Sequence, residues 1–129
     1  YNNIIPLFAP EKKFRKLIMK IKTNSLEPGE PKDTEGSTLF EIYRAFATED
    51  ETKAVEKLYA DGIAWGEMKQ MLFEYINDHI KPAREKYESL IAEPSIVEKE
   101  LQRGAEKARE ISKPYLAEIR HAIGIRRLG

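Results

Sequence analysis

Apolar side chains recur along the chain at the three- and four-residue spacing of one face of an α-helix. The first such stripe predicts a helix over about residues 10–22, and its members are Phe14, Leu17, Ile18 and Ile21. Two capping boxes then precede shorter apolar stripes, Thr38 with Glu41 and Thr48 with Glu51. In each pair the hydroxyl and the carboxylate can bond free amides at a helix start, so two short helices are expected here.

Two longer apolar stripes fill the second half of the sequence. One runs from Trp65 to Ile91 and crosses Pro82, which should kink or split the helix because proline lacks the amide hydrogen bond. The other runs from Val97 to Ile123, after a third capping box that begins at Ser95, and Pro114 should bend it. Since no strand-like alternation occurs, the pattern predicts an all-α fold, an antiparallel bundle of about five helices.

Two segments lack a helical period. Residues 1–9 are interrupted by Pro6 and predict an extended entry segment, because proline holds the residue before it in extended backbone. Residues 23–37 combine glycine and proline with short polar side chains, which predicts a long ordered loop. A loop of this length usually carries a function or lies on a neighbouring surface.

Composition limits the classes of protein that this sequence can represent. Its 129 residues suffice for one domain, and 22 basic against 22 acidic side chains argue against a general electrostatic grip on nucleic acid or membrane. Without cysteine there is no disulfide or thiolate metal site, and neither a membrane-spanning run nor a signal peptide occurs. We expect a soluble, cytoplasmic protein, and the start at Tyr1 without Met fits a truncated product.

Residues that could carry out chemistry are sparse. His79 and His121 lie on different predicted helices, so exposed histidines are expected rather than a metal site or an acid–base pair. The glycines fall singly, which indicates no phosphate-binding loop, and no serine has a histidine partner close in sequence. The residues by themselves therefore indicate no active site.

Rows of basic side chains are the features that could bind a partner. The first predicted helix carries Lys12, Lys13, Arg15, Lys16, Lys20 and Lys22 opposite its apolar stripe. The last carries Lys99, Arg103 and Lys107 at a spacing of four, continued loosely by Arg120, Arg126 and Arg127. Each row is either a contact for an anionic partner or a solvated face, and the second could be neutralised by Glu100, Glu106 and Glu110.

Aromatic side chains could add base stacking to such a surface, as is common in RNA recognition. Tyr87 and Tyr115 are the candidates, but both fall on apolar stripes, so core packing is the favoured expectation for each. The Trp65-Gly66 pair at the start of a long helix is expected to have a structural role.

Five short strings carry a family resemblance. They are Tyr1-Asn2-Asn3 with the apolar residues that follow, Lys20-Ile21-Lys22-Thr23-Asn24-Ser25, Trp65-Gly66-Glu67-Met68-Lys69, Gly104-Ala105-Glu106-Lys107-Ala108 and His121-Ala122-Ile123-Gly124. In this order and spacing they resemble the region after the Lys-Met-Ser-Lys-Ser loop in bacterial tryptophanyl-tRNA synthetases, the class I tryptophan–tRNA ligases. Asn24 stands where that family more often has Asp, which leaves the role of residues 23–25 open.

The resemblance implies a ligase that activates tryptophan with ATP and magnesium and transfers it to its tRNA. The full-length enzyme is expected to be a homodimer. Its catalytic Rossmann domain, with a His-Ile-Gly-His-type motif and the Lys-Met-Ser-Lys-Ser loop, would lie upstream of this chain. The chain alone is therefore expected to hold no catalytic residue, metal or cofactor and to be inactive, with Tyr1, Asn2 and Asn3 adjoining the missing ATP loop.

The resemblance also divides the chain into two parts. Residues 1–37 would return from the catalytic domain, and residues 38–129 would form a helical anticodon-binding domain. The RNA contacts expected on this basis are, in order, Lys107, Arg103 and Lys99, followed by Arg84, Arg120 and Arg126. The alternative is a structural module that braces the catalytic domain and its mobile loop without reading RNA. It is favoured by the apolar entry segment and the long loop, which would pack on a missing partner.

Overall fold

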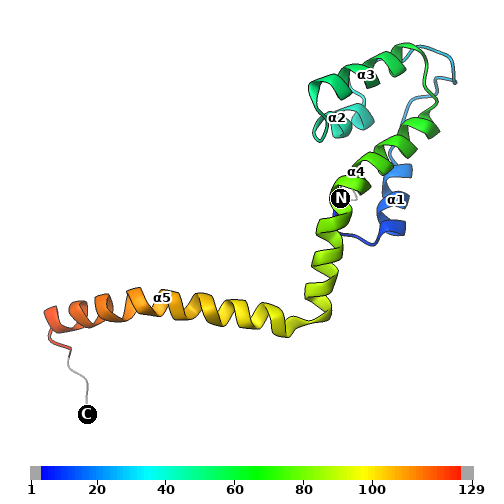
Figure 1. The fold of residues 1–129 in the computed structure, drawn as a ribbon. Coiled ribbons are helices and arrows are strands. Elements are labelled where there is room, and N and C mark those ends of the chain that lie inside the picture. The colour runs from blue at the N-terminus through cyan, green and yellow to red at the C-terminus, as the bar shows by residue number, and fades with distance from the viewer. Residues whose placement is uncertain (1–3, 126–129) are drawn as a thin grey trace. The chain divides into compact units, whose positions relative to one another are not determined.

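The computed structural model describes residues 4–125, and these residues form helices and loops without a strand. The helices are α1 (Glu11–Met19), α2 (Thr38–Arg44), α3 (Glu49–Ala60), α4 (Trp65–Ala92) and α5 (Pro94–Ala122) (Figure 1). The predicted all-α class with five helices is confirmed. Both long helices run without a break through their internal prolines, so Pro82 does not split α4.

The helix starts show which capping predictions hold. At α3 the Thr48 hydroxyl accepts from the Glu51 amide at 3.4 Å while the Glu51 carboxylate accepts from the Thr48 amide at 2.8 Å, which confirms that capping box. At α2 the cap is Ser37, one residue before the predicted Thr38. At α5 Pro94 is the first helical residue, so the predicted cap at Ser95 is wrong. Proline suits that position because its missing amide would have no helical partner.

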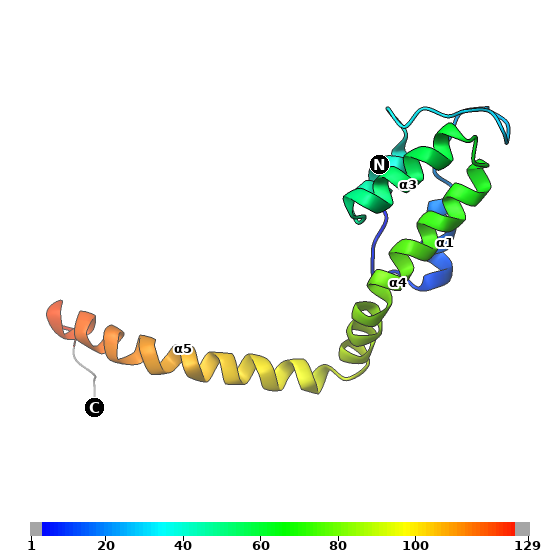
Figure 2. The ribbon, with the colours of Figure 1, turned by 45° about the horizontal axis from the view of Figure 1, so that its top comes forward.

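The chain divides into two compact units with a boundary after Tyr87. The first unit holds the apolar core, built by α1, α2, α3 and the first part of α4, with α1 lying beside α4 in both ribbon views (Figure 2). Phe14 and Ile18 of α1 are fully buried in this core. Residues 10–22 therefore pack with residues 38–80 in one unit, and the division at residue 37 stays a prediction.

The second unit is dominated by α5, in which no described residue is buried. Its apolar stripe faces solvent, with Leu101, Ile111 and Tyr115 each more than 60% exposed. The favoured expectation that Tyr115 packs in a core is therefore wrong, because none of the described residues of α5 is buried. None of the helices in residues 4–125 is long and apolar enough to span a membrane.

The long loop after α1 is ordered by contacts with the end of α3. The Gly29 amide donates to the Gly62 carbonyl at 2.8 Å, and the Lys32 amide donates to the Tyr59 carbonyl at 2.8 Å. The buried Lys32 ammonium also donates to two loop carbonyls, those of Glu27 and Glu30, at 2.9 Å each. These bonds satisfy the polar groups that the loop would otherwise bury unpaired.

Gly62 is the position on which this docking rests. Its φ is +85°, and a Cβ there would lie 2.5 Å from the Gly29 carbonyl carbon. The left-handed conformation alone costs a side-chain-bearing residue about 1–2 kcal/mol. We predict that Gly62→Ala lowers the free energy of unfolding by at least about that amount, measured by chemical denaturation. Gly66→Ala is the matched control, since open space surrounds its Cβ, and it should be neutral or stabilising.

A second contact network joins α3 to α4 through Glu51. The Tyr75 hydroxyl donates to the Glu51 carboxylate at 2.9 Å, beside the bonds from Thr48. The bonds from the backbone and hydroxyl of Thr48, and then that from Tyr75, lower the pKa of Glu51. Burial first, and then the hydrogen bond to Glu51, raise the pKa of Tyr75 to about 12, so the phenol stays a donor at neutral pH.

Glu51 therefore makes a pH-dependent contribution to stability. A carboxyl whose pKa is lower in the folded state stabilises the fold above its unfolded value, and the contribution is lost as the pH falls through the folded pKa. We predict that Glu51→Gln unfolds more easily than wild type at pH 7 and that the two converge below the ordinary glutamate value of 4.5. Denaturation midpoints across pH test this, with Glu56→Gln on the same helix as control. A gap that stays constant at acidic pH would contradict it.

Candidate nucleic-acid interface

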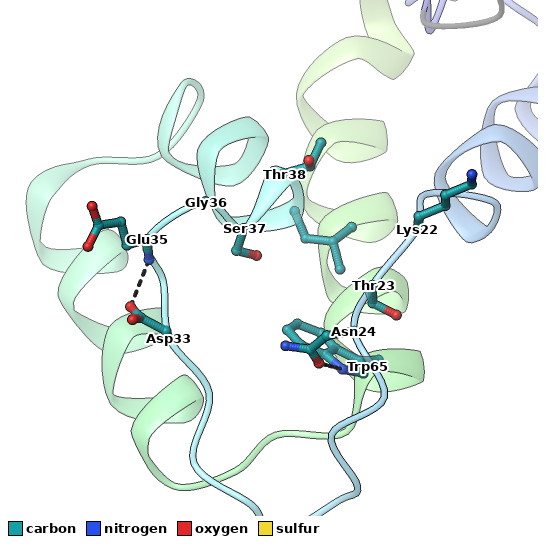
Figure 3. A pocket seen from close by; sticks show the side chains of 10 residues that line it. Lys22, Thr23, Asn24, Asp33, Glu35, Gly36, Ser37, Thr38 and Trp65 are labelled. Atoms are coloured by element: carbon teal, nitrogen blue, oxygen red, sulfur yellow. Dashed lines mark hydrogen bonds between the residues drawn. The ribbon is translucent and has the colours of Figure 1, made fainter.

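A pocket opens on the first unit between two stretches of the long loop and the start of α4 (Figure 3). Its volume is about 230 Å³, and most of its lining residues are polar, with the buried Leu39 and with Trp65 as the apolar ones. The lining residues are Lys22, Thr23, Asn24, Asp33, Glu35, Gly36, Ser37, Thr38, Leu39 and Trp65. Residues 22–24 form one side and residues 33–38 form the other, and Trp65 lies beside Asn24 (Figure 3).

One hydrogen bond fixes the Asn24 side of the pocket. The Trp65 indole Nε1 donates to the Asn24 Oδ1 atom at 2.9 Å, and the Leu26 amide donates to the same oxygen at 3.2 Å. Two donors on one oxygen identify it as the carbonyl of the amide, so its partner Nδ2 must point elsewhere. Figure 3 shows that nitrogen turned towards the interior of the pocket.

Two neighbouring side chains pack against Trp65. The Tyr59 and Trp65 rings lie in an edge arrangement with centroids 5.7 Å apart, and the Lys32 ammonium lies 5.4 Å from the Trp65 ring centroid. The Tyr59 and Ser37 hydroxyls share a hydrogen bond of 2.9 Å, which ties this support to the opposite wall. Burial raises the pKa of Tyr59, so it remains a neutral phenol. The pocket is thus formed before any ligand arrives.

The sequence did not predict this pocket. Asn24 and Trp65 are 41 residues apart. The sequence predicts a loop of open function around Asn24 and a structural helix start at Trp65. The sequence features that could have indicated the pocket are two short polar stretches in one long loop and the single tryptophan of the chain. Only the docking of that loop on α3 brings them together.

The basic row of α5 is exposed, as predicted. Lys99, Arg103 and Lys107 follow each other at a spacing of four on one helix, and Arg120 lies in its last turn. Arg103 forms an ion pair with Glu100, in which both side chains remain more than 60% exposed. An exposed pair of this kind is weak, so it leaves the guanidinium available to a stronger anionic partner.

The basic face of α1 is also in solvent, with Lys12, Lys13 and Lys16 exposed. Arg15 is partly engaged, because its guanidinium donates to the Gln70 side chain at 2.8 Å and lies 5.9 Å from the Phe73 ring centroid. This face therefore combines structural contacts to α4 with free charge.

Arg84 has a different environment from the one expected. It is only 4% exposed, donates to the Asn77 side chain at 2.9 Å and lies 5.6 Å from the Phe14 ring centroid. Its Nε and Nη2 atoms are buried without a hydrogen-bond partner. The expectation of a surface RNA contact at Arg84 is therefore corrected, because a buried guanidinium cannot reach a phosphate.

Four of the residues named in the sequence analysis lie outside the described part of the chain. They are Tyr1, Asn2, Asn3 and Arg126. His79 is exposed and bonded through Nδ1 to the Tyr75 carbonyl at 2.8 Å. Tyr87 lies against Phe8, with ring centroids 5.2 Å apart, but it is 44% exposed and outside the core, so the core packing expected for it is wrong. Within residues 4–125, no group of three histidine, cysteine or acidic side chains could hold a metal ion.

The curated proteins most similar to this chain in the comparison are tryptophan–tRNA ligases. No family model matches the chain. It is 50% identical over 129 residues to tryptophan–tRNA ligase from Xanthomonas campestris pv. campestris, which covers 99% of this chain and 30% of that protein. Against the ligase from Neisseria meningitidis the identity is 49% over 128 residues, covering 99% of this chain and 38% of the relative. The chain thus spans about a third of the length of these relatives.

Solved structures agree with the sequence comparison. Tryptophanyl-tRNA synthetase from Campylobacter jejuni matches with a TM-score of 0.88 and 37% identity, over 96% of this chain and 39% of that one. The same protein complexed with ADP and tryptophan matches with a TM-score of 0.85 and 38% identity, over the same shares of the two chains. Sequence and fold together show that the chain belongs to the tryptophanyl-tRNA synthetase family and corresponds to the C-terminal helical region of its members.

Proposed function

We propose that this chain is the tRNA-anticodon-recognition region of a ligase that activates tryptophan with ATP and transfers it to its tRNA. The observation that carries the proposal is 50% identity over 99% of the chain to a tryptophan–tRNA ligase. The chain spans only part of such a ligase, so the catalytic groups belong to the remainder. ATP and magnesium would bind there.

The proposed region would hold RNA through the exposed cations of α5. Lys107, Arg103 and Lys99 form one row that can meet successive phosphates, and Arg120 extends it. Phosphate contacts position an RNA without reading its sequence, so base recognition needs separate groups. Because 22 basic side chains are balanced by 22 acidic ones, specific contacts must supply much of the affinity for RNA.

The ligase would act in the cytoplasm, where its tRNA is found, and as a homodimer.

A second candidate function is supported by apolar surface near the entry segment. Ile4 is 75% exposed, and a groove of about 230 Å³ is lined by Ile5, Leu7, Phe14, Ile18, Ile42, Phe46 and Ile76. Exposed apolar surface of this kind favours a module that braces the rest of the ligase. The long loop does not add to this case, because it is packed on α3 of its own chain.

The two candidates make different predictions for charge reversal on α5. We predict that Arg103→Glu combined with Lys107→Glu in the full-length ligase reduces kcat/KM for tRNA charging at least about tenfold, through repulsion of phosphates. Tryptophan-dependent exchange between ATP and pyrophosphate should stay nearly unchanged, since that step needs no tRNA. Charging and exchange assays on the same preparations measure both effects.

The matched control is Lys53→Glu combined with Lys57→Glu on α3, which has the same charge change and the same spacing. It should leave both reactions near wild type. Equal losses of charging and exchange in the α5 variant would instead support the bracing module.

A further inference from the structure

The basic face of α1 has no part in the RNA contacts assigned to α5. Residues 10–24 hold six basic side chains and one acid, Glu11, in a chain whose formal net charge is zero. Lys12, Lys16 and Lys20 are exposed and follow one another at a spacing of four. A local excess of positive charge of this size in a neutral chain indicates an anionic partner for this face.

This lysine row lies on the side of α1 that faces away from the core. Phe14 and Ile18 on the opposite side are fully buried, so the packing of the first unit fixes which way the lysines point. Lys20 is the C-cap residue of α1 and keeps right-handed helical backbone, so it continues the row. Successive lysines are therefore about 6 Å apart along the helix axis, the rise of four residues. This spacing is comparable with that of neighbouring phosphates along an RNA strand.

No carboxylate of the described residues forms an ion pair with the row. Arg15 donates to Gln70, which donates to the Glu74 carboxylate at 2.6 Å, so that acid is linked to Arg15 rather than to a lysine. In the described part of the chain, the α1 lysine side chains make no hydrogen bond or ion pair. The Lys69 ammonium adds positive charge at the end of α1, where it donates to the Met19 carbonyl at 3.3 Å. Like charges four residues apart on a helix repel each other, and a bound anion would offset that repulsion.

The position of α1 along the chain indicates which part of a tRNA would meet it. The chain corresponds to the C-terminal region of its family, so the rest of the ligase would join it through the entry segment. Lys12 follows Ile4 by eight positions, which limits their separation to about 29 Å even in a fully extended chain. A tRNA that is being charged has its acceptor end at the catalytic part and its anticodon at the opposite end. A surface this close to the catalytic part would therefore meet tRNA outside the anticodon arm.

We propose that Lys12, Lys16 and Lys20 form a phosphate-binding surface for the part of the tRNA outside its anticodon arm, separate from the α5 row. The inference rests on the proposed function, since it needs tRNA as the partner. Lysine suits a backbone contact because it meets a phosphate as a point charge and reads no base. The surface would raise the affinity for tRNA without selecting its sequence, and its contribution would weaken with salt.

The test measures how the full-length ligase binds the complete tryptophan tRNA, the same tRNA without its anticodon arm, and the isolated arm, over a series of salt concentrations. Lys12→Glu combined with Lys16→Glu, the α1 variant, should weaken binding of complete tRNA at least about tenfold. The slope of log affinity against log salt should become shallower by about two, one for each lost phosphate contact. The same losses should appear with the tRNA that lacks its anticodon arm, and the isolated arm should bind normally.

Two control variants show whether charge and position cause the effect. Lys12→Arg combined with Lys16→Arg keeps both charges and should bind all three RNAs as the wild type does. Lys53→Glu combined with Lys57→Glu makes the same charge change at the same spacing on α3, and it should also leave binding unchanged. Tryptophan-dependent exchange between ATP and pyrophosphate should stay normal in each variant, because that step needs no tRNA.

The possible results distinguish failure of this inference from failure of the proposed function. If the α1 variant binds complete tRNA normally, or loses as much affinity for the isolated anticodon arm, the inference is wrong and the proposed function stands. If the α1 variant also loses exchange, α1 contacts the rest of the ligase rather than RNA, and the inference is again wrong. If the wild-type ligase neither binds nor charges tRNA, the proposed function fails, and the inference fails with it.

Discussion

The docking of residues 23–37 on the end of α3 is the contact on which the rest of the first unit depends. Gly29 and Gly62 meet backbone to backbone, at a separation that leaves no room for a Cβ on Gly62. Lys32 is buried at the same place and satisfies loop carbonyls with its ammonium. A charged group is costly to bury unless it is bonded in this way, so the loop and the lysine stabilise each other.

This docking also makes the pocket. Two polar stretches of the loop become its walls because the segment between them is held against α3, and Trp65 lies on the Asn24 side. The hydrogen bond from Trp65 to Asn24 then converts a flexible surface amide into a donor of fixed direction. A change in the docking should therefore also be felt at the pocket.

The second unit differs from the first because its helix, α5, has no buried residue. A helix of 29 residues without a buried side chain gains little from packing, and its exposed apolar stripe lies on the same helix as a basic row. Most helical stability in proteins comes from packing an amphipathic face, so α5 has the character of a surface that is completed by something else. Under the proposed function, the rest of the ligase and tRNA are the candidates for covering this helix, and the relative from Xanthomonas campestris is about three times as long as this chain.

The sequence by itself determined the helices, because their apolar period and the Thr48–Glu51 capping box are local properties of neighbouring residues. It also carried the family resemblance, since strings such as Gly104-Ala105-Glu106-Lys107-Ala108 keep their identity without a fold. Only the tertiary structure decided that Arg84 is buried, that Tyr115 is exposed and that Asn24 meets Trp65. Burial and long-range contact depend on which elements pack together, and a spacing rule within one helix contains no information about the neighbour that its faces will meet.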